Sequence, residues 1–145
     1  MAFRHILLAT DFSDCSARAS DTAIELARAS GARITLLHVH PIPSGGGVEG
    51  VAIGASDECA AALALEGALA ELRRRWPRSE SLLTYGAPWE QIILAAEARQ
   101  ADVVVMGTHG RRGLPRALLG SVAEVVVRRS SVPVLTVGSS ERSAA

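Results

Sequence analysis

Short apolar runs alternate with segments of helical pattern along almost the whole chain, and this alternation limits the folds that the sequence can adopt. Strands buried in a parallel sheet are near-continuous apolar runs, whereas helices that pack on a sheet repeat their apolar residues at helical spacing. The expected strands are His5–Ala9, Arg33–Val39, Ser81–Tyr85, Asp102–Met106 and Val132–Val137. Strands that alternate with helices predict an α/β fold with a single doubly wound, five-stranded parallel sheet, Rossmann-like, with helices on both faces.

The helices are bounded by residues with known preferences for helix ends. We expect them after Ser13 as far as Gly31, from a Ser56 cap to Pro77, from Pro88 to about Gln100, and over Ser121–Arg129. In the third helix, Ile93 and Ala96 are expected to point inward. The glycine-rich stretch 41–56 is expected to be a loop.

Length and composition favour one domain over residues 1–138 with a loose tail at 139–145. Only 3% of the 145 residues are aromatic, and fifteen acidic residues balance fifteen basic ones, so nucleic acid is not an expected partner. No apolar run is long enough for a membrane span, and no secretory leader is evident. Cys15 and Cys59 make no disulfide framework and are expected to be packed thiols, which favours a cytoplasmic protein.

All fifteen basic residues are arginine, and the chain has no lysine. A P-loop NTPase needs the lysine of its phosphate-binding loop. Protein kinases and Schiff-base enzymes also act through a lysine. The composition therefore excludes these three classes.

The segment Met106–Ser121, MGTHGRRGLPRALLGS, carries the strongest functional signal. Gly107 follows an apolar strand directly, and Gly120 with Ser121 opens the last helix. Glycines let the backbone approach a ligand closely, and a helix N-terminus favours an anion. The segment also holds three arginines and no acid, at positions 111, 112 and 116. These features favour phosphate binding, although a solvated loop with surface arginines stays an alternative.

Other residues carry weaker functional signals. Asp11 follows the first strand; because Ser13 caps the next helix, Asp11 is expected to be free for another role, the alternative being a turn residue. His38 and His40 are paired on the second strand, but no further metal ligand lies at a recognisable spacing. His109 fits either a phosphate contact or a solvated loop residue. A triad of Asp11, His109 and Ser121 is disfavoured because no nucleophile elbow is present.

These motifs together resemble the universal stress protein family. ATP-binding members carry a glycine, two residues, a glycine, nine residues, then a glycine and a serine or threonine. Gly107, Gly110, Gly120 and Ser121 fit that spacing without a gap. The first strand with Thr10 and Asp11, the run LLHVH from position 36, and VPVLTV near the end extend the resemblance over almost the whole chain.

The resemblance implies a sheet order of 3-2-1-4-5 and a nucleotide site at the carboxyl ends of the first and fourth strands. It assigns Ala9 and Val39 to the adenine, and Asp11 to the ribose or a metal-bound phosphate. Met106 and Gly107 would flank the ribose and phosphates. The phosphate cradle would be formed by Gly110, Arg111, Gly120, Ser121 and Val122. The family also implies Mg²⁺ or Mn²⁺ carried by the nucleotide, near Asp11 and Ser121, and a homodimer through Val132–Val137.

The favoured function is therefore a regulatory, stress-response protein that binds ATP, or AMP or a related adenine nucleotide, as a homodimer. No catalytic residue is assigned, because no general base is evident beside the phosphates. Two alternatives stay open. One is a slow ATP hydrolase or adenylyl-transfer enzyme, and the other is an interaction scaffold that binds no nucleotide. The downstream partner is not indicated by the sequence.

Overall fold

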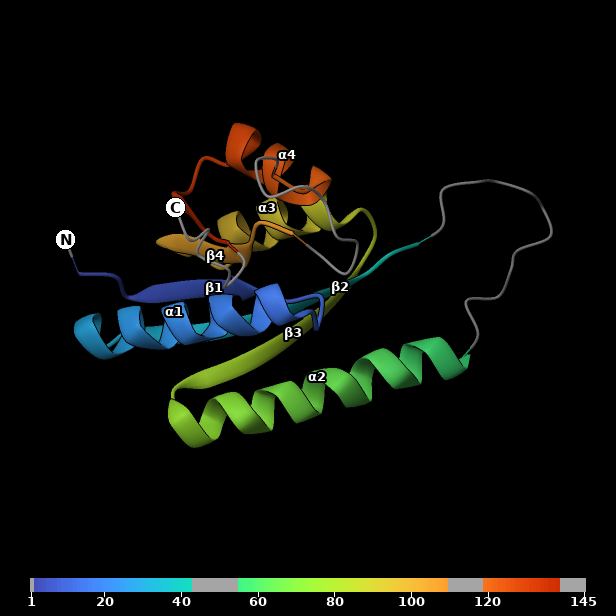
Figure 1. The fold of residues 1–145 in the computed structure, drawn as a ribbon, viewed down its shortest axis with the longest axis horizontal. Coiled ribbons are helices and arrows are strands. Elements are labelled where there is room, and N and C mark those ends of the chain that lie inside the picture. The colour runs from blue at the N-terminus through green and yellow to red at the C-terminus, as the bar shows by residue number, and fades with distance from the viewer. Residues whose placement is uncertain (1, 43–54, 110–118, 139–145) are drawn as a thin grey trace, which may run out of the picture.

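Five strands form one sheet in the computed structural model of this chain, which describes residues 2–42, 55–109 and 119–138 (Figure 1). The strands are β1 His5–Ala9, β2 Arg33–His40, β3 Ser79–Tyr85, β4 Val103–Gly107 and β5 Val134–Val137. Their order is β3-β2-β1-β4-β5, and every neighbouring pair is parallel. The predicted sheet and the strand order implied by the resemblance are both confirmed.

Helices cover both faces of the sheet, as predicted. They are α1 Asp14–Ser30, α2 Ala55–Arg75, α3 Pro88–Ala98 and α4 Ser121–Arg129. Helices α1 and α2 cover one face, and α3 and α4 cover the other (Figure 1). Side chains of β1 alternate between two cores: Ile6 and Leu8 pack with α1 and α2, whereas Leu7 and Ala9 pack with α3 and α4. Within the described residues, no helix combines the length and the apolar character that a membrane span requires.

Helix α1 begins and ends at the residues that the sequence predicts. The Ser13 side chain accepts a hydrogen bond from the backbone N–H of Ser16 at the N-cap. Gly31 ends the helix with φ 73°, a left-handed conformation that glycine adopts without a steric penalty, and its N–H bonds to the Ala27 carbonyl. These caps fix where β1 turns into α1, and that turn forms part of the site described below.

Several element bounds differ from the predicted ones. β3 begins at Ser79 rather than Ser81, because its first polar residues pair with β2 at the sheet edge, where apolar content is no guide. β5 begins at Val134 rather than Val132, since Pro133 has no N–H to give to the ladder. Ser56 lies inside α2 instead of capping it, and α3 ends at Ala98 with Ile92, not Ile93, among its buried residues.

Candidate functional site

A cleft of about 1120 Å³ opens at the carboxyl ends of β1, β2 and β4. β1 and β4 lie side by side, and the chain leaves β1 toward β2 on one side and leaves β4 toward β5 on the other. Loops diverge at such a switch point, and this is where α/β sheets usually bind ligands. The topology therefore creates the cleft before any side chain is considered.

One end of the cleft is apolar. Ala9, Val39 and Met106 are buried at the ends of three neighbouring strands and form its floor. Small side chains of α2 and residues of α3 add to its walls; they are Ala60, Ala61, Ala64, Pro88 and Ile92. A flat, uncharged group such as a nucleobase fits this chemistry.

Asp11 lies at the polar side of the cleft and also holds the β1–α1 turn. Its Oδ1 accepts hydrogen bonds from the Ser13 N–H at 3.0 Å and the Ser16 hydroxyl at 2.6 Å. The expectation that Ser13 leaves Asp11 without a structural task is therefore wrong. Burial acts to raise the pKa of Asp11, but the hydrogen bonds from Ser13 and Ser16 outweigh it and hold this pKa below its ordinary value. The carboxylate is charged at neutral pH and held in a fixed orientation.

Phe12 adopts a strained backbone conformation beside Asp11. Its φ of 65° is unusual for a residue with a large side chain. The ring lies against the His38 imidazole, with 4.4 Å between the centroids. His38 Nδ1 lies 2.9 Å from the Thr10 carbonyl oxygen, so this nitrogen is the donor. Strain of this kind gathers at functional sites, and here it shapes the wall of the cleft.

No metal centre is formed around His38 and His40 by the part of the chain that the structure describes. Groups of three or more histidine, cysteine, aspartate or glutamate side chains able to hold an ion are absent from those residues. Cys15 is buried, and its Sγ donates to the Val137 carbonyl at 3.1 Å, so it is a packed thiol as expected. Cys59, in contrast, is exposed, and the expectation of packing is wrong for it.

Gly107 and Gly120 are both required by close packing. A Cβ on Gly107 would lie 2.9 Å from the Cys15 Sγ and 3.1 Å from the Cys15 carbonyl carbon. A Cβ on Gly120 would lie 2.8 Å from the Thr108 carbonyl oxygen, to which the Gly120 N–H donates at 2.6 Å. Gly107 therefore lets β4 pack closely against α1, and Gly120 lets the start of α4 pack against Thr108, whatever ligand approaches them.

The N-terminus of α4 opens into the cleft. Gly120 is its N-cap residue and supplies no side-chain hydrogen bond. Ser121 and Val122 begin the helix and line the cleft. The first N–H groups of a helix have no intrahelical acceptor, and together with the helix dipole they favour an anion at this position.

His109 carries an unsatisfied polar atom beside this helix end. Its Nδ1 lies 2.9 Å from the Thr108 hydroxyl, whereas its buried Nε2 has no hydrogen-bond partner among the residues that the structure describes. An unpaired buried polar atom costs free energy, so a ligand that reached Nε2 would stabilise the site. A catalytic triad would require a hydrogen bond between His109 and Ser121, and none is formed within the described residues.

Most residues assigned to the nucleotide from the sequence meet in this one cleft. They are Ala9, Asp11, Val39, Met106, Gly107, Gly120, Ser121 and Val122. Gly110 and Arg111 lie outside the described residues. Phe12, Ser16 and the alanines of α2 were missed by the sequence analysis. The alanines recur at helical spacing, which is a signal, but nothing local shows that they face a cleft.

Comparisons with known proteins agree with this architecture. The model of the "Universal stress protein family" matches residues 2–138. A universal stress protein of Thermus aquaticus is 36% identical over 143 residues, which cover 93% of this chain and 98% of that protein.

Solved structures are similar over the whole fold. A universal stress protein in complex with cAMP has a TM-score of 0.73 and 28% identity, covering 97% of this chain and 100% of that one. The universal stress protein from Archaeoglobus fulgidus in complex with dAMP has a TM-score of 0.71 and 27% identity, covering 94% and 99%. This chain therefore belongs to the universal stress protein family.

Proposed function

We propose that this protein binds an adenine nucleotide, ATP in the first place, in the cleft at the carboxyl ends of β1, β2 and β4, and acts in regulation under stress. The observation that carries the proposal is the cleft itself, which has an apolar end beside a helix N-terminus. The similar structures with cAMP and dAMP support an adenine ligand, since both nucleotides share that base.

The apolar end of the cleft suits the base. In the proposed complex, Ala9 and Val39 lie against the adenine, and Met106 lies beside the ribose. The charged Asp11 carboxylate accepts hydrogen bonds from ribose hydroxyls, or holds a metal-bound phosphate. A base on the apolar floor would point the phosphates toward α4.

The polar end of the cleft suits the phosphates. Gly120, Ser121 and Val122 offer backbone N–H groups and a hydroxyl, and Gly107 lines the same cleft. Gly110 and Arg111 are proposed to complete this cradle, on the basis of the motif. The unpartnered Nε2 of His109 lies on the same side and would gain an acceptor from a phosphate oxygen.

The same residues fit a hard cation that arrives with the nucleotide. Mg²⁺ and Mn²⁺ prefer oxygen ligands, and the cleft offers the Asp11 carboxylate and the Ser121 hydroxyl. Two protein oxygens are few for a resident ion, but Mg²⁺ often takes most of its ligands from substrate phosphates and water. The ion would neutralise phosphate charge, while Asp11 and Ser121 orient the phosphates.

A substitution at Ser121 tests the phosphate end without disturbing the core. Gly120→Val is unsuitable, because its side chain would collide with the Thr108 carbonyl even without a ligand. Ser121 is exposed at the first position of α4, where a carboxylate favours the helix. Ser121→Glu is therefore expected to leave the melting temperature unchanged or raised, while its charge repels the phosphates.

Titration calorimetry with ATP and Mg²⁺ measures the effect. We expect Ser121→Glu to weaken binding by about tenfold or more, and the uncharged control Ser121→Gln to weaken it much less. Equal affinities of wild type and Ser121→Glu would place the phosphates elsewhere. An absence of ATP binding by the folded wild type would refute the proposal and favour the scaffold alternative.

The proposal includes a homodimer and a cytoplasmic location. β5 lies at the edge of the sheet, where unpaired backbone groups and the exposed Leu135 favour pairing with a second chain. The thiols of Cys15 and Cys59 are unpaired, which is consistent with a reducing compartment.

A further inference from the structure

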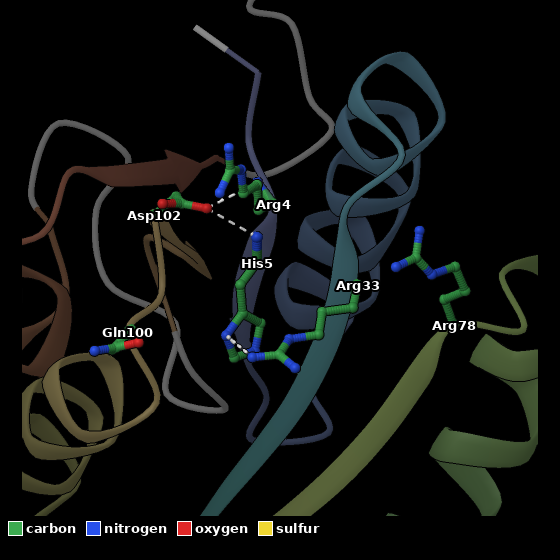
Figure 2. Close-up of a pocket in the computed structure, with 6 residues that line it drawn as sticks. All are labelled: Arg4, His5, Arg33, Arg78, Gln100 and Asp102. Atoms are coloured by element: carbon green, nitrogen blue, oxygen red, sulfur yellow. Dashed lines mark hydrogen bonds between the residues drawn. The ribbon is translucent and has the colours of Figure 1, made fainter.

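A second pocket lies at the opposite end of the strands from the nucleotide cleft. Its volume is about 470 Å³, and it opens at the amino ends of the strands (Figure 2). The lining residues are Arg4, His5, Arg33, Arg78, Gln100 and Asp102. The proposed nucleotide site uses none of these residues.

Strand register brings three arginines into one row. Arg4 directly precedes β1, Arg33 begins β2, and Arg78 directly precedes β3. His5 pairs with Arg33, and Ile34 pairs with Ser79, so Arg33 and Arg78 lie at the same level and Arg4 lies one residue before it. Adjacent strands lie only about 4.8 Å apart, so the three arginines line one end of the sheet, although their side chains point in different directions (Figure 2).

Little negative charge balances this row. Arg4, Arg33 and Arg78 make no ion pair with any described carboxylate, whereas Arg75, Arg99 and Arg128 pair with Asp21, Glu80 and Glu124. The single acid in the lining is Asp102, and its Oδ2 accepts the backbone N–H groups of Arg4 at 2.7 Å and His5 at 2.9 Å. With His5 neutral, three arginines and one aspartate leave the lining with two net positive charges.

One guanidinium group is held in place by an uncharged group, and a second lies beside the His5 ring. Arg78 Nη1 donates to the Gly31 carbonyl at 2.7 Å. Arg33 Nη2 lies 3.4 Å from Nδ1 of His5, a buried residue that forms the wall between the strands (Figure 2). The contact with Gly31 orients Arg78 and uses only part of its five-donor capacity. Nδ1 of His5 gives its proton to the Arg99 carbonyl, so it accepts none from Arg33. A positively charged pocket with oriented, incompletely used donors is matched by a dianion that accepts several hydrogen bonds at once.

We propose that this pocket binds the phosphate group of a small phosphorylated compound, at a site distinct from the nucleotide cleft. Guanidinium groups match phosphate oxygens with paired hydrogen bonds, which favours phosphate over a monovalent anion. The volume lies in the range of small-molecule pockets and exceeds what a lone phosphate needs, so an organic remainder fits beside it. Gln100 offers that remainder an amide donor and acceptor.

The experiment titrates inorganic phosphate, and separately glycerol phosphate, into isotopically labelled protein and follows the backbone amide signals. We expect saturable shifts at Arg4, His5, Arg33 and Asp102, with a dissociation constant of about 1 mM or tighter at low salt. Tighter binding of glycerol phosphate than of inorganic phosphate would support the place for an organic remainder. Shifts that never saturate, or that occur only at Ser121 and Val122, would overturn the proposal.

Matched variants assign the effect to the pocket. Arg33→Gln is expected to weaken binding by about tenfold, and Arg33→Lys less, because lysine keeps the charge but loses the paired geometry. Arg128→Gln removes an exposed arginine on α4 and is the charge-matched control. Ser121→Glu, which targets the nucleotide cleft, should leave these shifts unchanged. Equal weakening by Arg33→Gln and Arg128→Gln would reduce the effect to general charge attraction and contradict a site.

Discussion

At the scale of single residues, His5 shows how a buried polar side chain is satisfied by its neighbours. The ring is only 3% exposed, and its Nδ1 lies 2.9 Å from the Arg99 carbonyl oxygen. Because a carbonyl only accepts, Nδ1 carries a proton. Nε2 lies 2.7 Å from the Thr35 hydroxyl, which in turn lies 3.0 Å from Glu80 Oε1. The Thr35 hydroxyl donates its single proton to Glu80, so the His5 ring lies in a hydrogen-bonded chain that ends at a carboxylate.

The pKa of His5 is held below its ordinary value of 6.5. Burial is the main cause, and the positive charge of Arg33 adds to it. The Arg99 carbonyl and the carboxylates of Glu80 and Asp102 act in the opposite direction without overcoming burial. A lowered pKa means that the folded protein binds this proton less readily than the unfolded chain does.

This shift predicts how stability depends on pH. As the pH falls below 6.5, the unfolded chain takes up the His5 proton first, so the free energy of unfolding decreases until the pH passes the folded-state pKa. Urea unfolding at a series of pH values measures that slope. We expect a shallower slope in this pH range for His5→Gln, whatever its absolute stability. An unchanged slope would show that other groups cause the dependence.

At the scale of elements, α2 performs two tasks with two faces. Leu65 and Leu72 are buried in the core against β2 and β3. Ala60 and Ala64 lie on the cleft side, and both are exposed. Alanine stabilises the helix and leaves the cleft wide, so the same helix supports the fold and shapes the site.

A larger side chain on the cleft side of α2 is expected to narrow the site. Ala64→Phe should lower the affinity for ATP by about tenfold by filling space that the ligand needs. Ala70→Phe places the same side chain at an exposed position of α2 outside the cleft lining and is the matched control. Calorimetry with both variants measures the difference, and equal affinities would mean that the ligand does not reach α2.

At the scale of the whole molecule, the sheet has one strand edge with the properties of an interface. β5 pairs with β4 on one side only, and Leu135 is 38% exposed in the middle of this strand. Val127 of α4 is also exposed, on the helix that connects β4 to β5. Apolar side chains beside open backbone groups favour association with a second copy.

The proposed dimer has a direct test. Leu135→Glu would bring two like charges close together across a two-fold axis, so we expect monomers where the wild type forms dimers. Leu94→Glu changes a 50% exposed leucine on α3, away from this edge, and should leave the dimer intact. Sedimentation velocity reports the masses. A wild-type monomer, or dissociation by both variants alike, would contradict an interface through β5.

The sequence by itself determined the α/β class, the family, and the strand-end and glycine positions of the cleft. Apolar runs such as HILLA at His5–Ala9 and the glycine spacing after Met106 are local patterns, set by strand burial and by close backbone packing. Such patterns are visible along the chain because each involves neighbouring residues. Predicted element bounds were wrong where tertiary pairing outweighed local preference. At Ser79, for example, β3 begins earlier than predicted because β2 lies beside it.

Only the tertiary structure decided which distant residues share a site. Asp11 holds a turn and also lines the cleft, because Ser13 and Ser16 fold back onto its carboxylate. Arg4, Arg33 and Arg78 are scattered among the fifteen arginines of the sequence, and strand register alone makes them neighbours. The two ends of parallel strands lie a strand length apart. One fold therefore provides an apolar cleft with a helix N-terminus at the carboxyl ends and a positively charged pocket at the amino ends.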